Sequence, residues 1–239
     1  MFEVEDLSVV YPNGLQALKE VNISLSDIGI CGIIGPNGGG KTTFIKGVLG
    51  LTPAKGKVTF RGIPIKKWAK KTAYVEQKRD LDLDFPISVL QCVLLGTYPA
   101  LGFFKRPGKQ EKKQAEKALE QVGLADLKNR QIGELSGGQF QRVLIARTIV
   151  QNADLIFLDE PFVGIDVKSE AIIIDLLKNL AEQGKNIFIV HHDLSKVRRY
   201  FKNVILINKT VIAYGTVKKT YTKENLKNTF EVLDNPLFS

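Results

Sequence analysis

Hydrophobic positions in the first part of the chain recur at strand spacing. Apolar and polar residues alternate over Val21–Leu25, as in a strand with one buried face, whereas Ile28–Ile34 is nearly continuously apolar, as in a strand buried on both faces. Phe2–Val10 is a mixed strand candidate, and Gly and Pro separate two further short ones, Lys57–Arg61 and Ala73–Val75. The pattern predicts a strand-rich N-terminal region.

The period changes to that of helices after Phe85-Pro86. Charged residues alternate with Ala and Leu at helical spacing from Lys109 to Val122, and Gly123 is a plausible stop. A second helix is expected from Ser136 to Val150. Strands and helices then alternate: strand Leu155–Leu158, amphipathic helix Ser169–Gln183 and strand Asn186–Val190. This alternation favours βαβ units and a parallel sheet.

The last part of the chain combines a predicted hairpin with a basic tail. Val204–Ile207 and Val211–Tyr214 flank a turn at Asn208-Lys209-Thr210, and the tail after Thr216 is expected to be helical around Lys223–Glu231. No apolar run approaches the roughly 18–20 residues of a spanning helix. The acidic start of the chain does not have the order of a signal peptide. We therefore expect no membrane span.

Composition and charge narrow the class of protein. The chain has 239 residues with 44% hydrophobic and 25% charged, as in an ordinary globular protein. Its net charge of +9 implies an anionic partner, which could be nucleic acid, a membrane surface or phosphates. Cys31 and Cys92 stand outside any CxxC, which excludes a zinc knuckle or disulfide framework and favours two buried thiols.

A phosphate-binding motif follows the apolar strand at Ile28–Ile34. The motif GxxxxGK(S/T) comprises Gly35, Pro36, Asn37, Gly38, Gly39, Gly40, Lys41 and Thr42. Its glycines let backbone N–H groups surround an anion, and the helix expected over Phe44–Leu49 adds the positive end of its dipole. Lys41 is expected to reach the β- and γ-phosphates, Thr42 to ligate Mg²⁺ and Thr43 to bind phosphate beside it. The alternative is a glycine-rich turn that holds a lysine by chance.

Two acids end the apolar strand Leu155–Leu158. Ligands of a parallel sheet bind beyond the carboxyl ends of its strands, where Asp159 and Glu160 would emerge. Asp159 is placed to hold Mg²⁺, and Glu160 to polarise an attacking water as general base. The alternative is that the acids only end a strand at the surface.

A third motif, Leu135-Ser136-Gly137-Gly138-Gln139, places a potential N-cap, Ser136, and two glycines at a helix start. The chain resembles the ATP-binding cassette family, in which LSGGQ is the signature, over residues 1–215. The resemblance implies an α/β P-loop NTPase with a mainly parallel core sheet, an N-terminal antiparallel β subdomain and an inserted helical subdomain. The expected boundaries are 1–88 with 150–215 for the core, 89–149 for the helical subdomain and 216–239 for the tail.

The resemblance also implies roles for further residues. Cassettes dimerise head to tail, so Ser136, Gly137, Gly138 and Gln139 would bind the partner's ATP, and Asp166 would communicate across the dimer. Tyr11 would stack on adenine, although it could be a plain strand aromatic. Gln77 would sense Mg²⁺ and the attacking water, a role that rests wholly on the resemblance. His192 would contact the γ-phosphate as the switch histidine. The adjacent His191 raises a metal site as an alternative, but successive strand residues point to opposite faces.

Two stretches resemble the branch of bacterial importers for manganese, zinc or iron. They are Phe162-Val163-Gly164-Ile165-Asp166 and Asp84-Phe85-Pro86-Ile87-Ser88-Val89. Gly39 departs from the family, which commonly has Ala or Ser there. The branch implies an ATPase, most similar to that of a manganese importer, at the cytoplasmic face of the bacterial membrane. Its expected partners are two permease copies, received near Leu81–Phe104, a second copy of itself and an extracytoplasmic metal-binding protein.

The alternative function is a cassette ATPase that acts on nucleic acid or ribosomes. Such cassettes usually carry a long coiled coil or a second cassette, whereas only about sixty residues separate Gln77 from Ser136. The basic residues are also dispersed rather than interleaved with aromatics that could stack on bases. We therefore expect no direct nucleic-acid partner.

Overall fold

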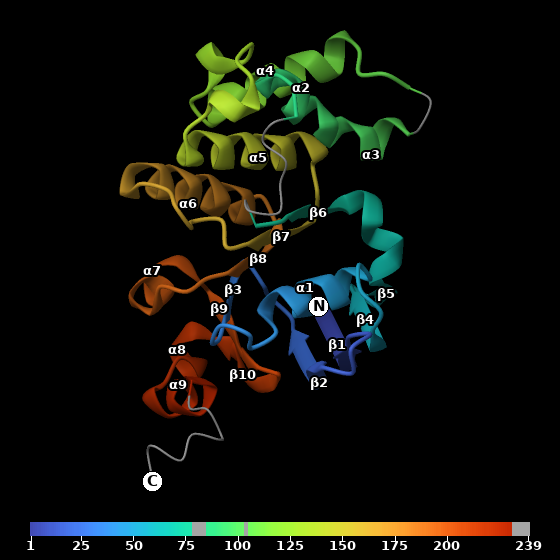
Figure 1. The fold of residues 1–239 in the computed structure, drawn as a ribbon, viewed down its shortest axis with the longest axis vertical. Coiled ribbons are helices and arrows are strands. Elements are labelled where there is room, and N and C mark those ends of the chain that lie inside the picture. Colours follow the sequence, from blue (N-terminus) through green and yellow to red (C-terminus); the bar gives the residue numbers. More distant parts are fainter. Residues whose placement is uncertain (78–84, 103–104, 231–239) are drawn as a thin grey trace. The chain divides into compact units, whose positions relative to one another are not determined.

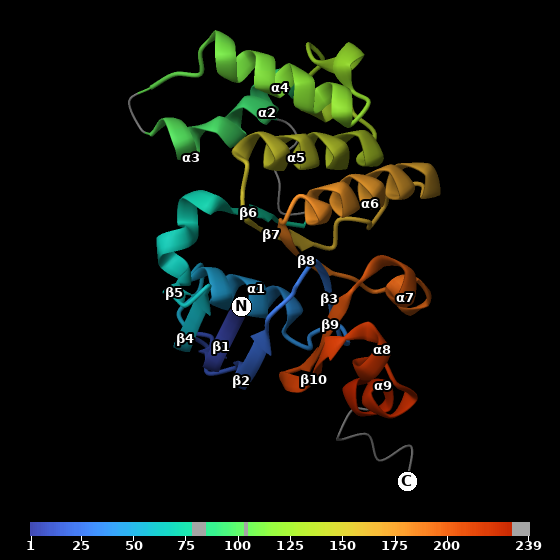
Figure 2. The ribbon, with the colours of Figure 1, turned by 180° about the vertical axis from the view of Figure 1, so that it is seen from behind.

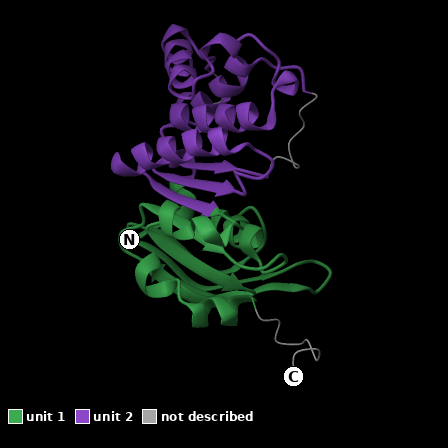
Figure 3. Cartoon of the chain, turned by 90° about the vertical axis from the view of Figure 1, so that its left-hand side faces the viewer, with its two compact units in different colours: residues 1–68, 190–239 green, residues 69–189 purple. Residues whose placement is uncertain are grey.

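The computed structural model describes residues 1–77, 85–102 and 105–230. The chain forms two compact units, residues 1–68 with 190–239 and residues 69–189 (Figure 3). The predicted helical subdomain, 89–149, lies inside the second unit. Two predictions fall partly outside the described residues. They concern Asp84 of the importer-like stretch and the two ends, 81 and 104, of the expected permease groove.

The first unit contains a four-stranded antiparallel sheet. Its strand order is β2 (Gln16–Leu25), β1 (Phe2–Val10), β4 (Lys55–Phe60) and β5 (Ile63–Pro64). The central strand β1 pairs Phe2 with Leu25 on one side and with Phe60 on the other. All three side chains are buried, so the start of the chain is fixed in the core of this unit.

A parallel strand pair in the first unit leads to the phosphate loop. β3 (Ile30–Ile34) runs parallel to β9 (Asn203–Asn208), and β9 forms a hairpin with β10 (Thr210–Thr216). α1 (Lys41–Leu49) follows β3 and packs against β1, where a Cβ on Gly47 would lie 3.2 Å from Val9 Cγ2. β3 is buried along its whole length, as its apolar sequence predicts.

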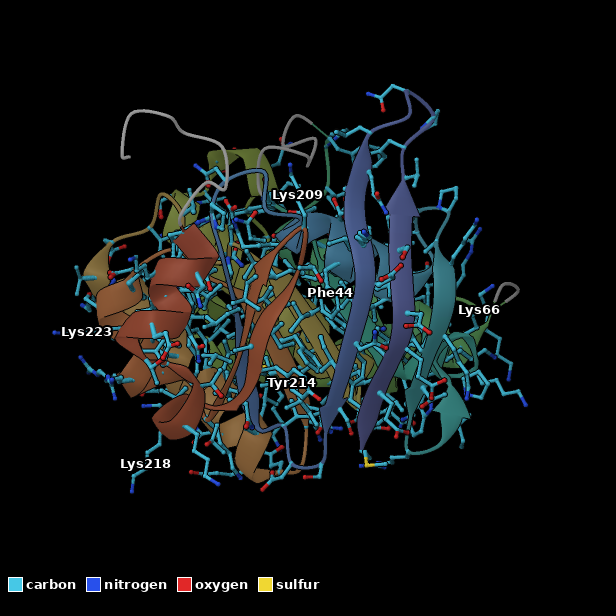
Figure 4. All side chains as sticks on the ribbon, turned by 90° about the horizontal axis from the view of Figure 1, so that it is seen from below. Phe44, Lys66, Lys209, Tyr214, Lys218 and Lys223 are labelled. Atoms are coloured by element: carbon cyan, nitrogen blue, oxygen red, sulfur yellow. The ribbon has the colours of Figure 1, made fainter. Side chains whose placement is uncertain are left out.

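The described part of the first unit also contains three short α-helices near its C-terminal end. They are α7 (Val197–Tyr200), α8 (Val217–Thr220) and α9 (Lys223–Phe230). α8 and α9 lie beside the β9–β10 hairpin in both views (Figures 1 and 2), and Asn208 Nδ2 donates to the Thr229 carbonyl at 3.0 Å. The basic residues of the tail point outward, as Lys218 and Lys223 do in Figure 4.

The second unit combines short parallel strands with helices. β6 (Thr72–Val75) runs parallel to β7 (Leu155–Asp159), and β8 (Asn186–Val190) lies on the other side of β7. Phe157 and Phe188 stack at 4.9 Å between β7 and β8. Among its described residues, the α-helices are α2 (Val89–Leu94), α3 (Tyr98–Leu101), α4 (Lys109–Gln121), α5 (Gly137–Gln151) and α6 (Val167–Glu182). α2, α4 and α5 pack on one another (Figures 1 and 2).

The strand and helix predictions are confirmed, with shifted ends. β2 begins at Gln16 rather than Val21, and α6 begins at Val167 rather than Ser169. The described part of the expected helix at 223–231 ends at Phe230. Cys31 and Cys92 are both buried free thiols, as predicted. Within residues 1–77, 85–102 and 105–230, no helix has the length and apolar character needed to cross a membrane.

Candidate nucleotide-binding site

The phosphate loop, residues 35–42, connects the end of β3 to the first turn of α1. Gly38 and Gly40 have φ values of 75° and 92°, which glycine adopts without steric cost. A Cβ on Gly40 would lie 2.6 Å from Leu18 Cδ2 and 2.9 Å from the Ala17 carbonyl oxygen, and one on Gly35 would collide with the Ile207 carbonyl oxygen. The loop therefore needs glycine for its conformation at Gly38, for space at Gly35 and for both reasons at Gly40.

Backbone hydrogen bonds fasten the loop to the hairpin and to its own helix. The Gly39 N–H donates to the Pro36 carbonyl at 3.1 Å, while the Gly39 carbonyl accepts from the Lys209 N–H at 2.8 Å. The Phe44 N–H donates to the Gly40 carbonyl at 2.7 Å, which starts α1. These contacts give the loop a fixed shape within the first unit.

Lys41 places its ammonium group over the loop. Its Nζ donates to the Gly35 carbonyl at 3.0 Å and to the Pro36 carbonyl at 2.7 Å, and the residue is 6% exposed. The N-cap of α1 is Gly40, which has no side chain to accept from the first-turn N–H groups, and the first turn holds no acidic residue. A buried ammonium and an uncapped helix start thus gather positive charge at one point, which suits an anion.

Tyr11 contacts the same helix turn. Its hydroxyl is 2.8 Å from Thr43 Oγ1, so the end of β1 is hydrogen-bonded to the first turn of α1. Thr43 is buried, whereas the Tyr11 side chain is only half-buried. The structure therefore brings together two residues predicted to contact nucleotide; stacking of Tyr11 on adenine stays a prediction.

In the second unit, the predicted acids and Gln77 emerge at one sheet edge. Val75 is paired with Leu158 in the parallel β6–β7 ladder, and Gln77 and Glu160 each follow two residues beyond that pair. Asp159 is 1% exposed and Gln77 is 6% exposed. Because parallel strands end on the same side, both segments lie at the carboxyl edge of this sheet, where ligands of α/β proteins bind.

Glu160 has an unusual backbone conformation. Its φ of 54° lies in the left-handed region, which costs a residue with a Cβ roughly 1–2 kcal/mol. Non-glycine residues in this region often belong to functional sites, where the surrounding structure maintains the strain. The conformation is therefore consistent with the catalytic role predicted for Glu160.

The signature helix α5 begins with a reciprocal capping box. Ser136 Oγ accepts from the Gln139 N–H at 3.3 Å, and Gln139 Oε1 accepts from the Ser136 N–H at 2.9 Å. The predicted N-cap role of Ser136 is thus confirmed. A Ser followed three residues later by Gln is the sequence pattern of such a box, but the role predicted for Gln139 was contact with nucleotide alone.

Asp166 caps the neighbouring helix, α6. Its Oδ1 accepts from the Ser169 N–H at 2.9 Å and its Oδ2 accepts from Ser169 Oγ at 2.7 Å. These hydrogen bonds lower the pKa of the Asp166 carboxyl, and the largest contribution comes from the Ser169 hydroxyl. This role was missed because the helix was expected to start two residues later.

Gly138 separates the starts of α5 and α6. A Cβ there would lie 2.5 Å from Ser169 Oγ, 2.8 Å from Ser169 Cβ and 3.2 Å from Asp166 Oδ2. The glycine therefore permits a close approach between the signature and the loop predicted to communicate across a dimer. Both groups belong to the second unit.

Gly138→Ala is expected to lower the free energy of unfolding by about 1–3 kcal/mol, the usual cost of overpacking. Helix propensity favours alanine over glycine by only about 1 kcal/mol, which does not offset a clash of this kind. Chemical denaturation measures the change. In a Ser169→Gly background, which lacks both close atoms, Gly138→Ala should cost clearly less than it does in the wild type; a single variant as stable as the wild type would contradict the close approach.

The two histidines have different environments after β8. His191 is 5% exposed and packs against the rings of Tyr200 and Phe201, at 5.9 and 5.5 Å. His192 is exposed, so the two side chains differ in burial, but β8 ends at Val190 and the histidines are not the successive strand residues that the sequence predicted. In the described part of the chain no three His, Cys, Asp or Glu side chains gather in a way that could hold a metal ion.

A buried parallel strand that runs into a glycine-rich loop and an anion-binding helix start defines a P-loop nucleotide-binding fold. Comparison with known proteins identifies the family: the sequence profile described as ABC transporter matches residues 18–163. The chain therefore belongs to the ABC transporter family, and like the ATP-binding proteins of that family it is an ATPase coupled to transport.

Individual relatives cover nearly the whole chain. It is 51% identical to the manganese transport system ATP-binding protein MntB of Listeria innocua, over 94% of this chain and 93% of that protein. It is 45% identical to the zinc transport system ATP-binding protein TroB of Treponema pallidum, over 95% and 86%. Among solved structures, the dimeric ATP-binding cassette MJ0796 with bound ADP and Pi is similar, with a TM-score of 0.78, 28% identity and coverage of 91% and 99%.

Proposed function

We propose that the chain is the ATP-binding and ATP-hydrolysing subunit that powers import of a divalent transition-metal ion through a separate membrane permease. Manganese is the preferred ion, and zinc or iron comes next. The observation that carries the proposal is the 51% identity to a manganese transport ATP-binding protein across 94% of the chain. The 45% identity to a protein named for zinc transport supports zinc as the second candidate ion.

The phosphate loop would bind MgATP through its backbone N–H groups and Lys41. The Thr42 hydroxyl of the first unit and the Asp159 carboxylate and Gln77 amide oxygen of the second would supply hard oxygen ligands of the kind that Mg²⁺ prefers. A carboxylate that is 1% exposed also suits a site that receives a cation. When bound, the ion would neutralise charge on the phosphates.

Hydrolysis would rely on positioning and charge stabilisation. Glu160 would polarise the attacking water, His192 would contact the γ-phosphate and Gln77 would sense the water. Thr43 would bind phosphate, and Tyr11 would stack on adenine. No covalent intermediate with the chain is needed, because these groups only orient the reactants and stabilise charge.

The active form would be a head-to-tail homodimer. The start of α5, with its two glycines, would close on the nucleotide that the partner's phosphate loop holds, through Ser136, Gly137, Gly138 and Gln139. Asp166 would report across the interface. The dimeric cassette with ADP and Pi supports this assembly, since its fold is shared over 91% of the chain.

The dimer would sit at the cytoplasmic face of a bacterial membrane, under two permease copies, and an extracytoplasmic protein would deliver the metal. The net charge of +9 suits a position near an anionic membrane surface. We place the permease contact in the segment 81–104, of which the structure describes 85–102.

Deleting the gene should lower cellular manganese more than zinc or iron, as measured by elemental analysis of cells grown in metal-limited medium. The wild-type gene should restore accumulation, and the matched Glu160→Gln gene should not. A larger loss of zinc or iron would show that this metal, and not manganese, is the transported ion. ATPase stimulation by DNA or RNA, with none by any membrane subunit, would overturn the transport proposal.

A further inference from the structure

The segment that carries His192 is held at both ends by contacts inside the first unit. It follows β8 directly, and its backbone enters a short 3₁₀ helix at Leu194–Lys196. One end is fixed by the buried ring of His191 and the other by the C-terminal part of the chain. None of the sequence motifs indicated the contact with the C-terminal part of the chain.

The His191 end is anchored to the strand that leads into the phosphate loop. The His191 N–H donates to the Ile33 carbonyl of β3 at 3.2 Å. Its ring packs on Phe201, and the Phe201 ring in turn covers Gly32 so closely that a Cβ there would lie 2.7 Å from Phe201 Cδ2. The backbone before His192 is therefore part of the core.

The other end is anchored by Tyr221. Its hydroxyl donates to the Leu194 carbonyl at 2.8 Å. Asp193 lies between His192 and Leu194, and its carboxylate holds the start of the 3₁₀ helix. It accepts from the Ser195 N–H at 3.0 Å and contacts Lys196 Nζ at 3.3 Å. Burial raises the pKa of the Tyr221 phenol, so the hydroxyl stays a donor throughout the physiological range.

Tyr221 is itself fixed by its neighbours. It is 7% exposed, its carbonyl accepts from Arg198 Nη2 at 3.2 Å, and the Arg198 guanidinium lies 5.6 Å from the centre of its ring. Asn225 Nδ2 donates to the Thr220 carbonyl at 2.8 Å, which joins α8 to α9. The hydroxyl of Tyr221 is thus presented by a rigid element rather than by a loose tail.

We propose that Tyr221 is a positioning residue for His192: the segment 217–230 braces the backbone beyond the switch histidine and keeps its exposed ring in place for the γ-phosphate. The inference rests on the proposed function and deepens it. If the backbone around His192 were anchored on one side alone, the imidazole would have to be ordered at each turnover. The entropy lost in that ordering would raise the activation free energy of hydrolysis.

Tyr221→Phe tests the brace, because it removes the hydroxyl and keeps the ring against Arg198. The matched control is Tyr214→Phe on β10, whose side chain is 40% exposed (Figure 4). The chain has only two histidines, so a tag-free protein with isotopically labelled histidine gives two ring signals in NMR. His192→Ala assigns them.

Tyr221→Phe should shift or broaden the His192 ring signal and leave the His191 signal in place, while Tyr214→Phe should change neither. Steady-state ATPase should lose about fivefold in kcat, the equivalent of one hydrogen bond, with KM for ATP unchanged. In a His192→Ala background the same substitution should have no further effect. Arg198→Gln should move the His192 signal in the same direction.

An unchanged His192 signal in Tyr221→Phe would overturn the brace, whatever the activity. An equal loss of kcat with and without His192 would also overturn it, since the effect would then not pass through that residue. Full hydrolysis by His192→Ala would instead refute the role proposed for His192. The ring signals report the brace independently, so the two failures are distinguishable.

Discussion

Glu160→Gln should abolish nearly all ATP hydrolysis, by about 10²–10⁴-fold in kcat, while ATP binding stays intact. Glutamine keeps the size and hydrogen-bonding shape of the side chain but cannot accept the proton of the attacking water at neutral pH. It also carries a Cβ like glutamate, so the left-handed backbone at φ 54° is equally strained in both. Phosphate release and binding of labelled ATP measure the two quantities separately.

The same variant should accumulate an ATP-bound dimer, because closure no longer ends in hydrolysis. Size-exclusion chromatography with and without MgATP would show it. Glu120→Gln on the exposed face of α4 makes the same charge change in the same unit and should behave as the wild type. Hydrolysis at the wild-type rate by Glu160→Gln would refute Glu160 as the general base.

Lys41→Ala should weaken ATP binding by roughly 10–100-fold, the equivalent of one or two charge-assisted hydrogen bonds to phosphate. The loss has two physical sources. The ammonium would contact the phosphates, and in this structure it also bonds the Gly35 and Pro36 carbonyls, so its removal loosens the loop itself. Titration calorimetry with MgATP measures the change.

Lys46→Ala is the matched control, because it removes the same charge from the opposite end of the same helix. It should leave ATP affinity within about twofold, because the half-buried Lys46 belongs to the last turn of α1, more than one turn beyond Lys41 and away from the uncapped helix start. Circular dichroism should show both variants folded. Unchanged ATP affinity in Lys41→Ala would refute the phosphate-loop assignment.

Elements with an unbroken pattern were predictable from the sequence, and elements shaped by irregular backbone were not. β3 is apolar throughout and β7 is apolar up to its last residue, Asp159, and both were placed within two residues at each end. β2 was predicted five residues too short because its pairing with β1 contains register shifts, and Glu20 has a φ of 45°. A bulge moves side chains to the other face and hides the alternation.

The residues of the site also fall into a group that the sequence predicts and a group that it does not. Its phosphate loop and acids lie in short contiguous motifs, so local sequence is enough to identify them. The contact between Tyr221 and Leu194 joins residues 27 positions apart, and the role of Gly138 depends on the start of another helix. Such partners are set by tertiary packing, which single-sequence periodicity does not encode. α2 was missed because its six residues are too few to show a helical period.

The starts of α1 and α5 set a limit on how far this protein can be stabilised by substitution. α5 closes its own end with Ser136 and Gln139, whereas α1 begins at a glycine with a φ of 92° against Leu18. A capping side chain at Gly40 would ordinarily add about 1 kcal/mol, but neither the conformation nor the space admits one. Thermostabilising changes must therefore be sought away from the phosphate loop, where resistance to heat and the capacity to hold an anion do not compete for the same N–H groups.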